Sequence, residues 1–489
     1  MPVAGAPPER GVADAGDRRV ADWDVTTQVG DEDADPPPRP RRWARLIVLI
    51  EHARPAAGSL RVSLDQLDEL ALERGGERGV ACGADGTSQT LRLPDRQMSR
   101  RHARLARGHH AWWLEDLGST NGTSIAGDRI ARRTLIDGDI FQVGSTTLLF
   151  RDSVVPPGYA VPTGATSVGA VPEVLQTLMP SLEQHFAQMA RVAASRLPVV
   201  IRGETGTGKE LLAQAIHQLS GRAGPFVAVN CGALPRSLLE SELFGYRRGA
   251  FSGANDPHDG LVRRAHGGTL FLDEIAELPP DAQAALLRVL QEGEVRPLGS
   301  SEAMRVDVRI VAASHQHLTR RVEAGAFRED LYARLAGFTA ELPPLRARLD
   351  DLGVLVANLL SRVAPASAAR IRLRRDAVSS LLAHPYPRNV RELEQALHSA
   401  VVLRDDSEIR VEHLRLEPGP AAGDVDTDGA DPAELPAQLS ERLKESRGNV
   451  AAVARAMGKA PTQIRRWCRR FGIDPDGFRD PGGDRHAEG

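Results

Sequence analysis

The feature of this sequence that most limits its fold is the segment GETGTGKE at residues 203–210. An apolar run at 199–201 comes before it, and a helical pattern begins at Leu211. Glycines allow successive backbone N–H groups to point toward phosphate oxygens, and the N-terminus of the following helix favours an anion. The segment therefore predicts a phosphate-binding loop in an α/β domain with a parallel sheet, formed by Gly203, Glu204, Thr205, Gly206, Thr207, Gly208, Lys209 and Glu210.

The lysine of this loop is informative because lysine is rare in the chain. The 62 Lys and Arg residues include three lysines, at positions 209, 444 and 459. Lys209 stands where a slender point charge must reach the β- and γ-phosphates, and the planar guanidinium of arginine would fit poorly there. A purely structural glycine turn would not need it. Glu210 occupies the position where many such loops carry a Ser or Thr that helps to hold Mg²⁺.

Two acids follow a second apolar strand pattern, GGTLFL at residues 267–272. Asp273 and Glu274 are placed as in a Walker B element. In phosphoryl transfer Asp273 would organise the Mg²⁺ that accompanies ATP, and Glu274 would orient or activate the attacking water. Arg328 and Arg334 are candidates to stabilise the charge that develops in this reaction.

Composition excludes several other classes of protein. The 489 residues carry a net charge of −3 and are 41% apolar and 26% charged, as in globular domains. The longest uninterrupted apolar runs, such as 46–50, are far shorter than the roughly 20 residues of a membrane span. The cysteines, at 82, 231 and 468, have no C-x-x-C spacing, which argues against disulfides and structural zinc. We expect a cytoplasmic protein without a membrane partner.

The residue pattern divides the chain into segments. Residues 1–42 are expected to be a disordered tail. Short β-rich runs between turn residues predict an all-β sandwich at 43–151. Helical runs that alternate with buried strands at 199–201, 226–229, 269–272 and 308–312 predict an α/β domain at 173–416. An all-α unit is expected at 435–473. The remaining segments are a linker at 152–172, an acidic linker at 417–434 and a tail at 474–489.

The segment ESELFGYRRGAFSGA at residues 240–254 resembles a loop of one family, the AAA+ bacterial enhancer-binding proteins that activate sigma-54 RNA polymerase. The family's GAFTGA motif is matched with Ser252 in place of threonine, which keeps the hydroxyl. The resemblance covers residues 173–416 and implies an AAA+ P-loop ATPase with a helical lid. It implies that sigma-54 is contacted by Gly249, Ala250, Phe251, Ser252, Gly253 and Ala254.

The same resemblance implies roles for single residues. Asn230 matches the asparagine that interacts with the Walker B glutamate. Arg328 and Arg334 match arginines supplied in trans, which implies a homo-oligomeric ring, expected to be a hexamer. Arg391 matches the sensor II arginine, which reads the nucleotide in cis. Glu210 after the lysine is the family's own form.

The chain departs from the family at two places near the nucleotide. Ser314 and His315 stand where the sensor I pair is commonly Thr-Asn. Tyr386 and Arg388 replace the usual Trp and Gly before sensor II. We expect these differences to affect the rate and the coupling of hydrolysis more than the reaction itself.

The β-rich region contains MSRRH at 98–102, DLGSTNG at 116–122 and LIDGD at 135–139. In this order the blocks resemble an FHA domain, which reads phosphothreonine peptides. By this match Ser99 and Thr120 would contact the phosphate, Asn121 the peptide backbone, and His102 would brace the loop.

One position weakens the FHA prediction. Ala84 stands where the family normally has the arginine that forms the main ion pair with the phosphate. Affinity for phosphothreonine should therefore fall unless Arg100 or Arg101 substitutes. Phosphopeptide reading, binding of an unphosphorylated partner and self-association remain open.

The C-terminal unit carries nine Lys/Arg against two Glu, although the whole chain is almost neutral. Apolar residues at 450, 453, 454 and 457, and again at 464, 467, 468 and 471, predict two short amphipathic helices joined by a turn. This resembles a Fis-like helix-turn-helix, whose second helix enters the major groove. We expect Thr462, Gln463, Arg465 and Arg466 to reach base edges, and Arg469 and Arg470 to contact phosphates.

Together these parts predict an ATP-dependent transcription activator. It would bind enhancer DNA, hydrolyse ATP in an oligomeric ring and remodel the closed complex of sigma-54 RNA polymerase holoenzyme. An FHA-type sensor domain, with a phosphothreonine protein or kinase as its partner, would control it. The alternatives are an AAA+ remodelling ATPase that acts on another protein, and a DNA-binding adaptor without productive hydrolysis.

Overall fold

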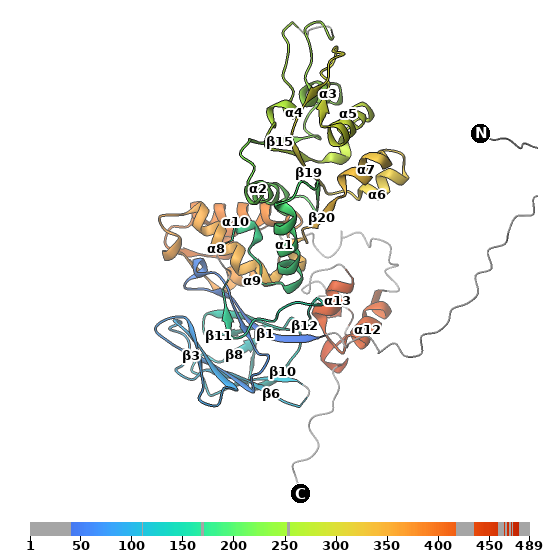
Figure 1. Ribbon diagram of the computed structural model, residues 1–489. Coiled ribbons are helices and arrows are strands. Elements are labelled where there is room, and N and C mark those ends of the chain that lie inside the picture. The colour runs from blue at the N-terminus through green and yellow to red at the C-terminus, as the bar shows by residue number, and fades with distance from the viewer. Residues whose placement is uncertain are drawn as a thin grey trace, which may run out of the picture. The chain divides into compact units, whose positions relative to one another are not determined.

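The computed structural model describes residues 41–489 apart from 110, 168–170, 252–254, 417–434, 458–463, 465–466, 469–470, 472 and 479–489 (Figure 1). The predicted all-β, α/β and C-terminal helical parts follow one another along the chain. Among the described residues, no helix is both long and apolar enough to cross a membrane.

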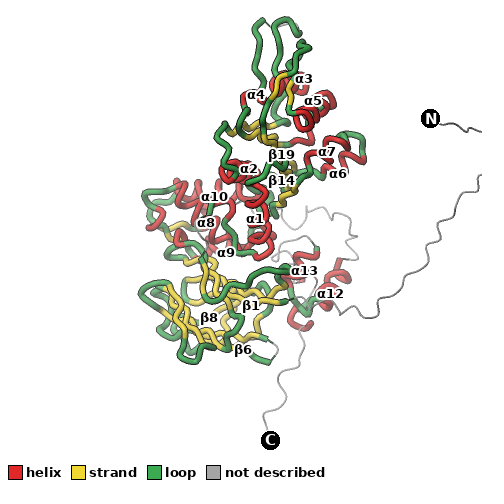
Figure 2. The backbone as a smooth tube through the Cα atoms, viewed as in Figure 1, coloured by secondary structure: helices red, strands yellow, loops and turns green. Residues whose placement is uncertain are grey.

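The N-terminal part is a β-sandwich, which confirms the prediction (Figure 2). It contains β1 (Arg42–Glu51), β2 (Leu60–Ser63), β3 (Glu69–Arg74), β4 (Gly79–Cys82), β5 (Ser88–Leu93), β6 (Ala103–Arg107), β7 (Trp112–Asp116), β8 (Thr123–Ile125), β9 (Asp128–Ile130), β10 (Arg132–Leu135), β11 (Ile140–Val143), β12 (Thr146–Val154) and β13 (Ala165–Thr166). One sheet has the order β13-β2-β1-β12-β11-β8-β9, and the other has the order β10-β7-β6-β3-β5-β4.

Strand β1 is apolar on both faces. Leu46 and Val48 point into the sandwich core. Ile47 and Leu49 point the other way, into a second core that they share with the helix α8 (Leu352–Val363). A strand covered on both faces reads as a continuous apolar run rather than an alternating one, which explains the uninterrupted sequence at 46–50.

Residues 152–172, which the sequence predicts to be a linker, are partly structured. Strand β12 extends to Val154, and β13 pairs antiparallel with β2. The ring of Tyr159 lies 5.9 Å from that of Trp43. Proline and glycine in this stretch interrupt the β pattern, so composition alone did not predict this short edge strand.

The central part contains a parallel sheet of β14 (Val199–Arg202), β15 (Phe226–Asn230), β16 (Thr269–Asp273), β19 (Arg309–Ser314) and β20 (Phe338–Glu341), in the order β15-β16-β19-β14-β20. The expected strands are present, and β20 was not foreseen. Around them lie η2 (Glu173–Leu175), α1 (Pro180–Ala193), α2 (Lys209–Leu219), α3 (Arg236–Phe244), α4 (Leu261–Arg264), η3 (Ile275–Glu277), α5 (Pro280–Glu292), α6 (Leu318–Glu323), α7 (Glu329–Leu335) and the short strands β17 (Glu294–Val295) and β18 (Met304–Arg305). All pairs in the five-stranded sheet are parallel, so their carboxyl ends share one edge.

Residues 345–351, which contain η4 (Leu345–Ala347) and η5 (Leu349–Asp351), follow β20 and connect the parallel sheet to a mainly helical lid. We call them the hinge segment. The lid comprises α8, η6 (Ala368–Arg370), β21 (Arg372–Leu373), α9 (Arg375–Ala383), α10 (Asn389–Leu403), β22 (Glu408–Ile409) and α11 (Val411–Leu414).

The C-terminal helices α12 (Leu435–Glu445) and α13 (Val450–Ala456) pack together and are followed by η7 (Pro475–Phe478). The side chain of Asn449 caps α13 by accepting a hydrogen bond from the Ala452 N–H at 2.9 Å. Their core includes Leu439, Leu443, Val450, Val453, Ala454, Ile464 and Cys468, with Met457, Trp467 and Phe471 packed against it. The apolar positions of the predicted helix-turn-helix therefore lie in one core.

Candidate nucleotide site and its neighbours

The glycine-rich loop connects β14 to α2 at the carboxyl edge of the parallel sheet. Gly206 and Gly208 have φ values of 79° and 101°, which only glycine adopts without strain. A Cβ at Gly206 would overlap the carbonyl oxygen of Arg388. The Lys209 ammonium group donates to the carbonyl oxygens of Gly203 and Glu204 at 3.0 and 3.3 Å. A buried cation thus lies within a loop of backbone polar groups, an arrangement that suits a phosphate chain.

The two acids of β16 lie beside this lysine. Glu274 Oε1 is 3.9 Å from Lys209 Nζ. Burial raises the pKa of Asp273, the nearby Glu274 raises it further, and Lys209 opposes both effects. A desolvated carboxylate next to a second acid favours a divalent cation, so these residues fit Mg²⁺. The φ of Glu274 is 52°, an unusual conformation for a residue other than glycine and one that is frequent at functional sites.

Asn230 and His315 both lie near Glu274, but their contacts differ. Asn230 pairs in register with Asp273, and its side-chain oxygen accepts a hydrogen bond from the Gly232 N–H at 2.9 Å. His315 Nδ1 lies 2.6 Å from Glu274 Oε2. The sensor I residue His315 therefore contacts the Glu274 carboxylate through its imidazole ring. Asn230 instead bonds to the backbone.

The lid contacts the phosphate loop directly. The Arg391 N–H donates to Gly206 O at 3.3 Å, and its side-chain charge lowers the pKa of Asp273. The Asn389 amide donates to Glu204 Oε2 at 3.1 Å and to Thr205 O at 3.0 Å. These contacts place the predicted sensor II residue at the nucleotide site.

Sequence reasoning missed one cation of this site, Arg346 in the hinge segment. Its guanidinium forms two hydrogen bonds with the Glu204 carboxylate, one of them 2.8 Å long. These hydrogen bonds lower the pKa of Glu204. The pair joins positions 142 residues apart, so no local pattern could have indicated it.

Arg328 and Arg334 lie at the two ends of α7, and both are exposed. The Arg328 guanidinium binds the Asp330 carboxylate at 2.7 and 3.0 Å. Helix α7 packs on α5 and α6. The structure therefore leaves both arginines on the surface.

The predicted sigma-54 loop follows α3 and extends beyond the helices (Figure 1). The Phe251 side chain is 42% exposed, and its ring lies 4.9 Å from that of Tyr246. Gly249 has a φ of 83°, and Ala250 lies beside Gly299. Ser252, Gly253 and Ala254 lie outside the described residues.

The predicted phosphopeptide residues gather at one end of the sandwich. Ser99 Oγ accepts the Thr120 N–H at 3.1 Å. Asn121 donates to Gln97 O at 2.7 Å. His102 is fully buried and accepts the Ser99 N–H on Nδ1 at 3.1 Å, which fixes the loop as predicted.

The structure does not place Ala84 at this end of the sandwich, which corrects the expectation from the sequence. Ala84 lies in the turn between β4 and β5, next to Ser88, and the Asp85 side chain closes that turn through bonds to Thr87 and Ser88. Ser99 O instead accepts the Arg74 N–H, and Arg74 pairs with Leu93 at the other end of β5. The cations beside the Ser99 loop are therefore the exposed Arg74 and Arg100.

The predicted base and phosphate contacts of the last helix, Thr462, Gln463, Arg465, Arg466, Arg469 and Arg470, lie outside the described residues. The described neighbour Ile464 is buried in the C-terminal core, and Trp467 packs against that core.

A five-stranded parallel sheet with a phosphate loop, an acidic strand end and a helical lid defines an AAA+ P-loop ATPase domain, and the sandwich before it is an FHA domain. Comparison with family models agrees. Residues 175–341 match the Sigma-54 interaction domain, residues 346–428 the AAA+ ATPase lid domain and residues 80–144 the FHA domain.

The chain belongs to the family of sigma-54-dependent transcriptional regulators. It is 40% identical over 313 residues to the transcriptional regulatory protein GlrR of Escherichia coli K12, covering 63% of this chain and 70% of GlrR. It is 46% identical over 301 residues to the hydrogenase transcriptional regulatory protein HoxA of Cupriavidus necator, covering 58% of this chain and 62% of HoxA. The chain thus spans less than two thirds of HoxA. A crystal structure of Brucella abortus NtrX with ADP is 30% identical, with a TM-score of 0.48, over 63% of this chain and 70% of NtrX.

Proposed function

We propose that this protein is an ATP-dependent transcription activator that remodels the closed complex of sigma-54 RNA polymerase holoenzyme. The observation that carries the proposal is the convergence of Lys209, Asp273, Glu274 and Arg391 around one phosphate loop, in a domain whose exposed loop contains Phe251. This activity requires ATP hydrolysis at the phosphate loop and contact with sigma-54 at the loop that contains Phe251.

Each residue of the nucleotide site has a distinct task. Lys209 and the backbone N–H groups from 203 to 209 bind the phosphates of ATP. Asp273 would hold Mg²⁺, which would neutralise charge on the phosphate oxygens. Glu274 orients and deprotonates the attacking water, and His315 positions that carboxylate.

The exposed arginines point to an oligomer. Arg328 and Arg334 are exposed at the surface, where a neighbouring subunit can bind, and they act on the nucleotide of that subunit. A ring, which we expect to be a hexamer, gives every nucleotide site an arginine pair. Arg391 reads the nucleotide within its own subunit.

The flanking parts bind the DNA site and regulate the activity. The helices from 435 to 473 bind enhancer DNA, with Arg465 and Arg466 at base edges and Arg469 and Arg470 at phosphates. The FHA domain binds a regulatory protein partner through Ser99, Arg100, Thr120 and Asn121. The activity takes place in the cytoplasm, where the polymerase and the promoter are found.

The experiment that tests this function is ATP-dependent open-complex formation with purified sigma-54 holoenzyme on promoter DNA. We expect open complexes with the wild-type chain and ATP, and none with Lys209→Ala. ATP hydrolysis without open complexes would favour a remodelling ATPase that acts on another protein. DNA binding without Lys209-dependent hydrolysis would favour an adaptor.

A further inference from the structure

The FHA sandwich is packed onto the ATPase lid through an apolar contact. Ile47, Leu49 and Leu149 of the sandwich share one hydrophobic core with Leu352 and Val356 of α8. At Gly353 the helix comes so close that a Cβ would overlap Leu49 O and Ser59 Oγ. Because the backbone of α8 lies this close to the sandwich, the helix cannot slide along it. The sandwich and the lid therefore form one packed unit.

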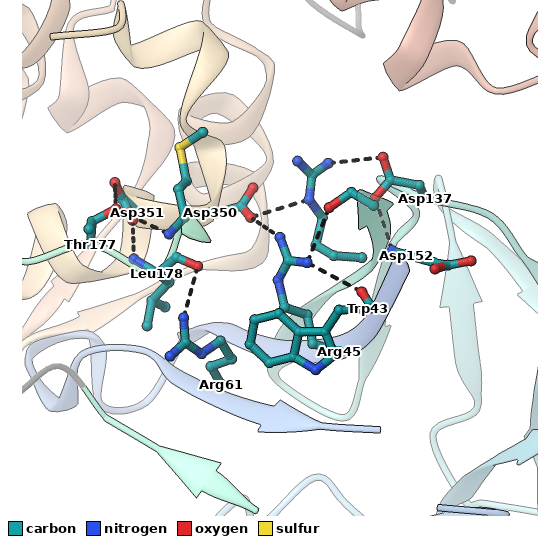
Figure 3. A network of polar contacts seen from close by, with 12 residues as sticks. Trp43, Arg45, Arg61, Asp137, Asp152, Thr177, Leu178, Asp350 and Asp351 are labelled. Atoms are coloured by element: carbon teal, nitrogen blue, oxygen red, sulfur yellow. Dashed lines mark hydrogen bonds and ion pairs between the residues drawn. The ribbon is translucent and has the colours of Figure 1, made fainter. Parts of the chain in front are cut away.

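Buried charge joins the sandwich to the hinge segment (Figure 3). Asp350 Oδ2 lies 3.5 Å from Arg45 Nη2 and 3.2 Å from Arg151 Nε. Arg45 is 1% and Asp350 2% exposed. Asp137 of the sandwich balances the second arginine at 3.5 Å. Since a buried ion pair leaves an uncompensated charge when one partner is removed, Asp350 holds both arginines in place.

The sandwich is also bonded to the α/β side of the hinge. Arg61 donates to Leu178 O at 3.3 Å and to Glu183 Oε2, in α1, at 2.9 Å. Asp351 in turn accepts the Leu178 N–H at 2.7 Å and the Thr177 hydroxyl at 2.9 Å. The FHA domain therefore contacts the hinge segment, the lid and the start of the α/β domain at once.

The other end of the hinge segment reaches the nucleotide site. Arg346 binds Glu204 of the phosphate loop, and the Leu345 N–H donates to Asn389 at the start of α10 at 2.8 Å. Asp350 lies four positions after this arginine. A short segment thus carries the sandwich contact at one end and the phosphate-loop contact at the other.

From this arrangement we propose that the docked FHA domain is a clamp on the ATPase hinge, which represses ATP turnover until the sandwich is released from Asp350. The proposal rests on the proposed ATPase function and names its regulation. Any rotation of the lid against the α/β domain passes through residues 345–351. Because the sandwich is bonded on both sides of that segment, the rotation must break these contacts or be prevented.

The test is Asp350→Asn in the full-length chain. The amide keeps the shape of the side chain but removes its ion pairs with Arg45 and Arg151. We expect the melting temperature to fall while the steady-state rate of ATP hydrolysis rises at least about fivefold, a typical coupling between two sites. Loss of a merely structural contact would lower stability without raising the rate.

The matched control is Asp376→Asn, which changes the same residue type on the exposed surface of the lid. We expect the control to hydrolyse ATP at the wild-type rate. An Asp350→Asn rate equal to or below that of the control would overturn the clamp.

A reversible lock gives an independent test. An ideal Cβ at Gly58 lies 3.7 Å from the Ala357 Cβ, a separation that a disulfide can span. Since Gly58 has a φ of 69° and a ψ of −177°, a cysteine there strains the backbone, and the oxidised and reduced forms of one variant are compared because both carry that strain. In a background of Asp350→Asn with the exposed Cys82 changed to Ser, Gly58→Cys with Ala357→Cys should return ATP hydrolysis to the wild-type rate when oxidised. Reduction should restore the faster rate. Equal rates in both states, with the disulfide formed, would contradict the proposal.

Hydrogen exchange separates the clamp from the ATPase proposal. If neither wild type nor Asp350→Asn hydrolyses ATP faster than Lys209→Ala, the proposed function fails. Amide exchange then decides on the clamp: faster exchange in Asp350→Asn at both 345–351 and 203–209 supports it. Faster exchange at the hinge segment alone overturns it, because release of the sandwich would then have no effect on the phosphate loop.

Discussion

The nucleotide site and the phosphopeptide end of the FHA domain are both shaped for phosphate, but they differ in charge and burial. The nucleotide site encloses a lysine that is 7% exposed, between glycines with left-handed backbones. The FHA end offers the neutral hydroxyls of Ser99 and Thr120, beside the exposed side chains of Arg74 and Arg100. A buried cation makes the first site dependent on one residue, whereas the second spreads its contacts over several weak donors.

The largest effect is expected at the lysine. Lys209→Ala should lower the rate of ATP hydrolysis at least about 100-fold, because no other described cation lies inside the glycine loop. Steady-state phosphate release measures this. Lys444→Ala, which removes the same charge from α12, serves as the control and should keep the wild-type rate. Equal rates for both variants would remove Lys209 from the chemistry.

The charge at the FHA end can be removed to sharpen this comparison. Arg100→Ala should lower affinity for a threonine-phosphorylated peptide about tenfold or more and leave affinity for the unphosphorylated one constant, since a charge-assisted hydrogen bond contributes about 1.5–3 kcal/mol. Calorimetric titration of both peptides measures the preference. Arg107→Ala, also exposed but at the far end of β6, controls for lost charge. Equal affinities of the wild-type chain for both peptides would exclude phosphate reading.

A smaller effect is expected at Ser99. Its hydroxyl accepts the Thr120 N–H and faces the peptide end, so Ser99→Ala removes a neutral contact of about 1 kcal/mol. Affinity for the phosphopeptide should fall several-fold while affinity for the unphosphorylated peptide stays constant. A similar loss for both peptides would indicate a change of loop structure.

The pH dependence should also distinguish the two sites. Burial lowers the pKa of His102, whose Nδ1 must remain unprotonated to accept the Ser99 N–H. A folded pKa below the unfolded value of about 6.5 stabilises the fold above that pH, and this contribution is lost as pH falls through the folded pKa. Urea unfolding from pH 7 to 5 should show a stability loss that is smaller in His102→Gln. An identical loss would exclude His102 as its source.

Local motifs made the nucleotide site predictable. The phosphate loop and the acids of β16 depend on a few adjacent residues and on strand order, so spacing predicted Lys209, Asp273 and Glu274 together. The contact of Arg346 with Glu204 and that of Arg45 with Asp350 join distant positions, and nothing in the spacing indicates them.

One feature of the sequence indicated the contact between the sandwich and the lid. The run at 46–50 has no polar alternation, which indicates a strand covered on both faces. Which partner covers it could not be read from the run, since the glycine that admits α8 is 307 residues from Leu46. The strand β13 within residues 152–172 was not predicted, because its pairing with β2 forms it and composition does not indicate that pairing.

In the proposed activity the Lys209 site and the loop that contains Phe251 act together on sigma-54. The most direct measurement is ATP-dependent open-complex formation by sigma-54 holoenzyme, compared between the wild-type chain and Phe251→Ala. We predict open complexes with the wild type and at least about a 100-fold lower rate with Phe251→Ala, because buried aromatic contacts dominate such interfaces. Open complexes formed at the wild-type rate by Phe251→Ala would contradict the account.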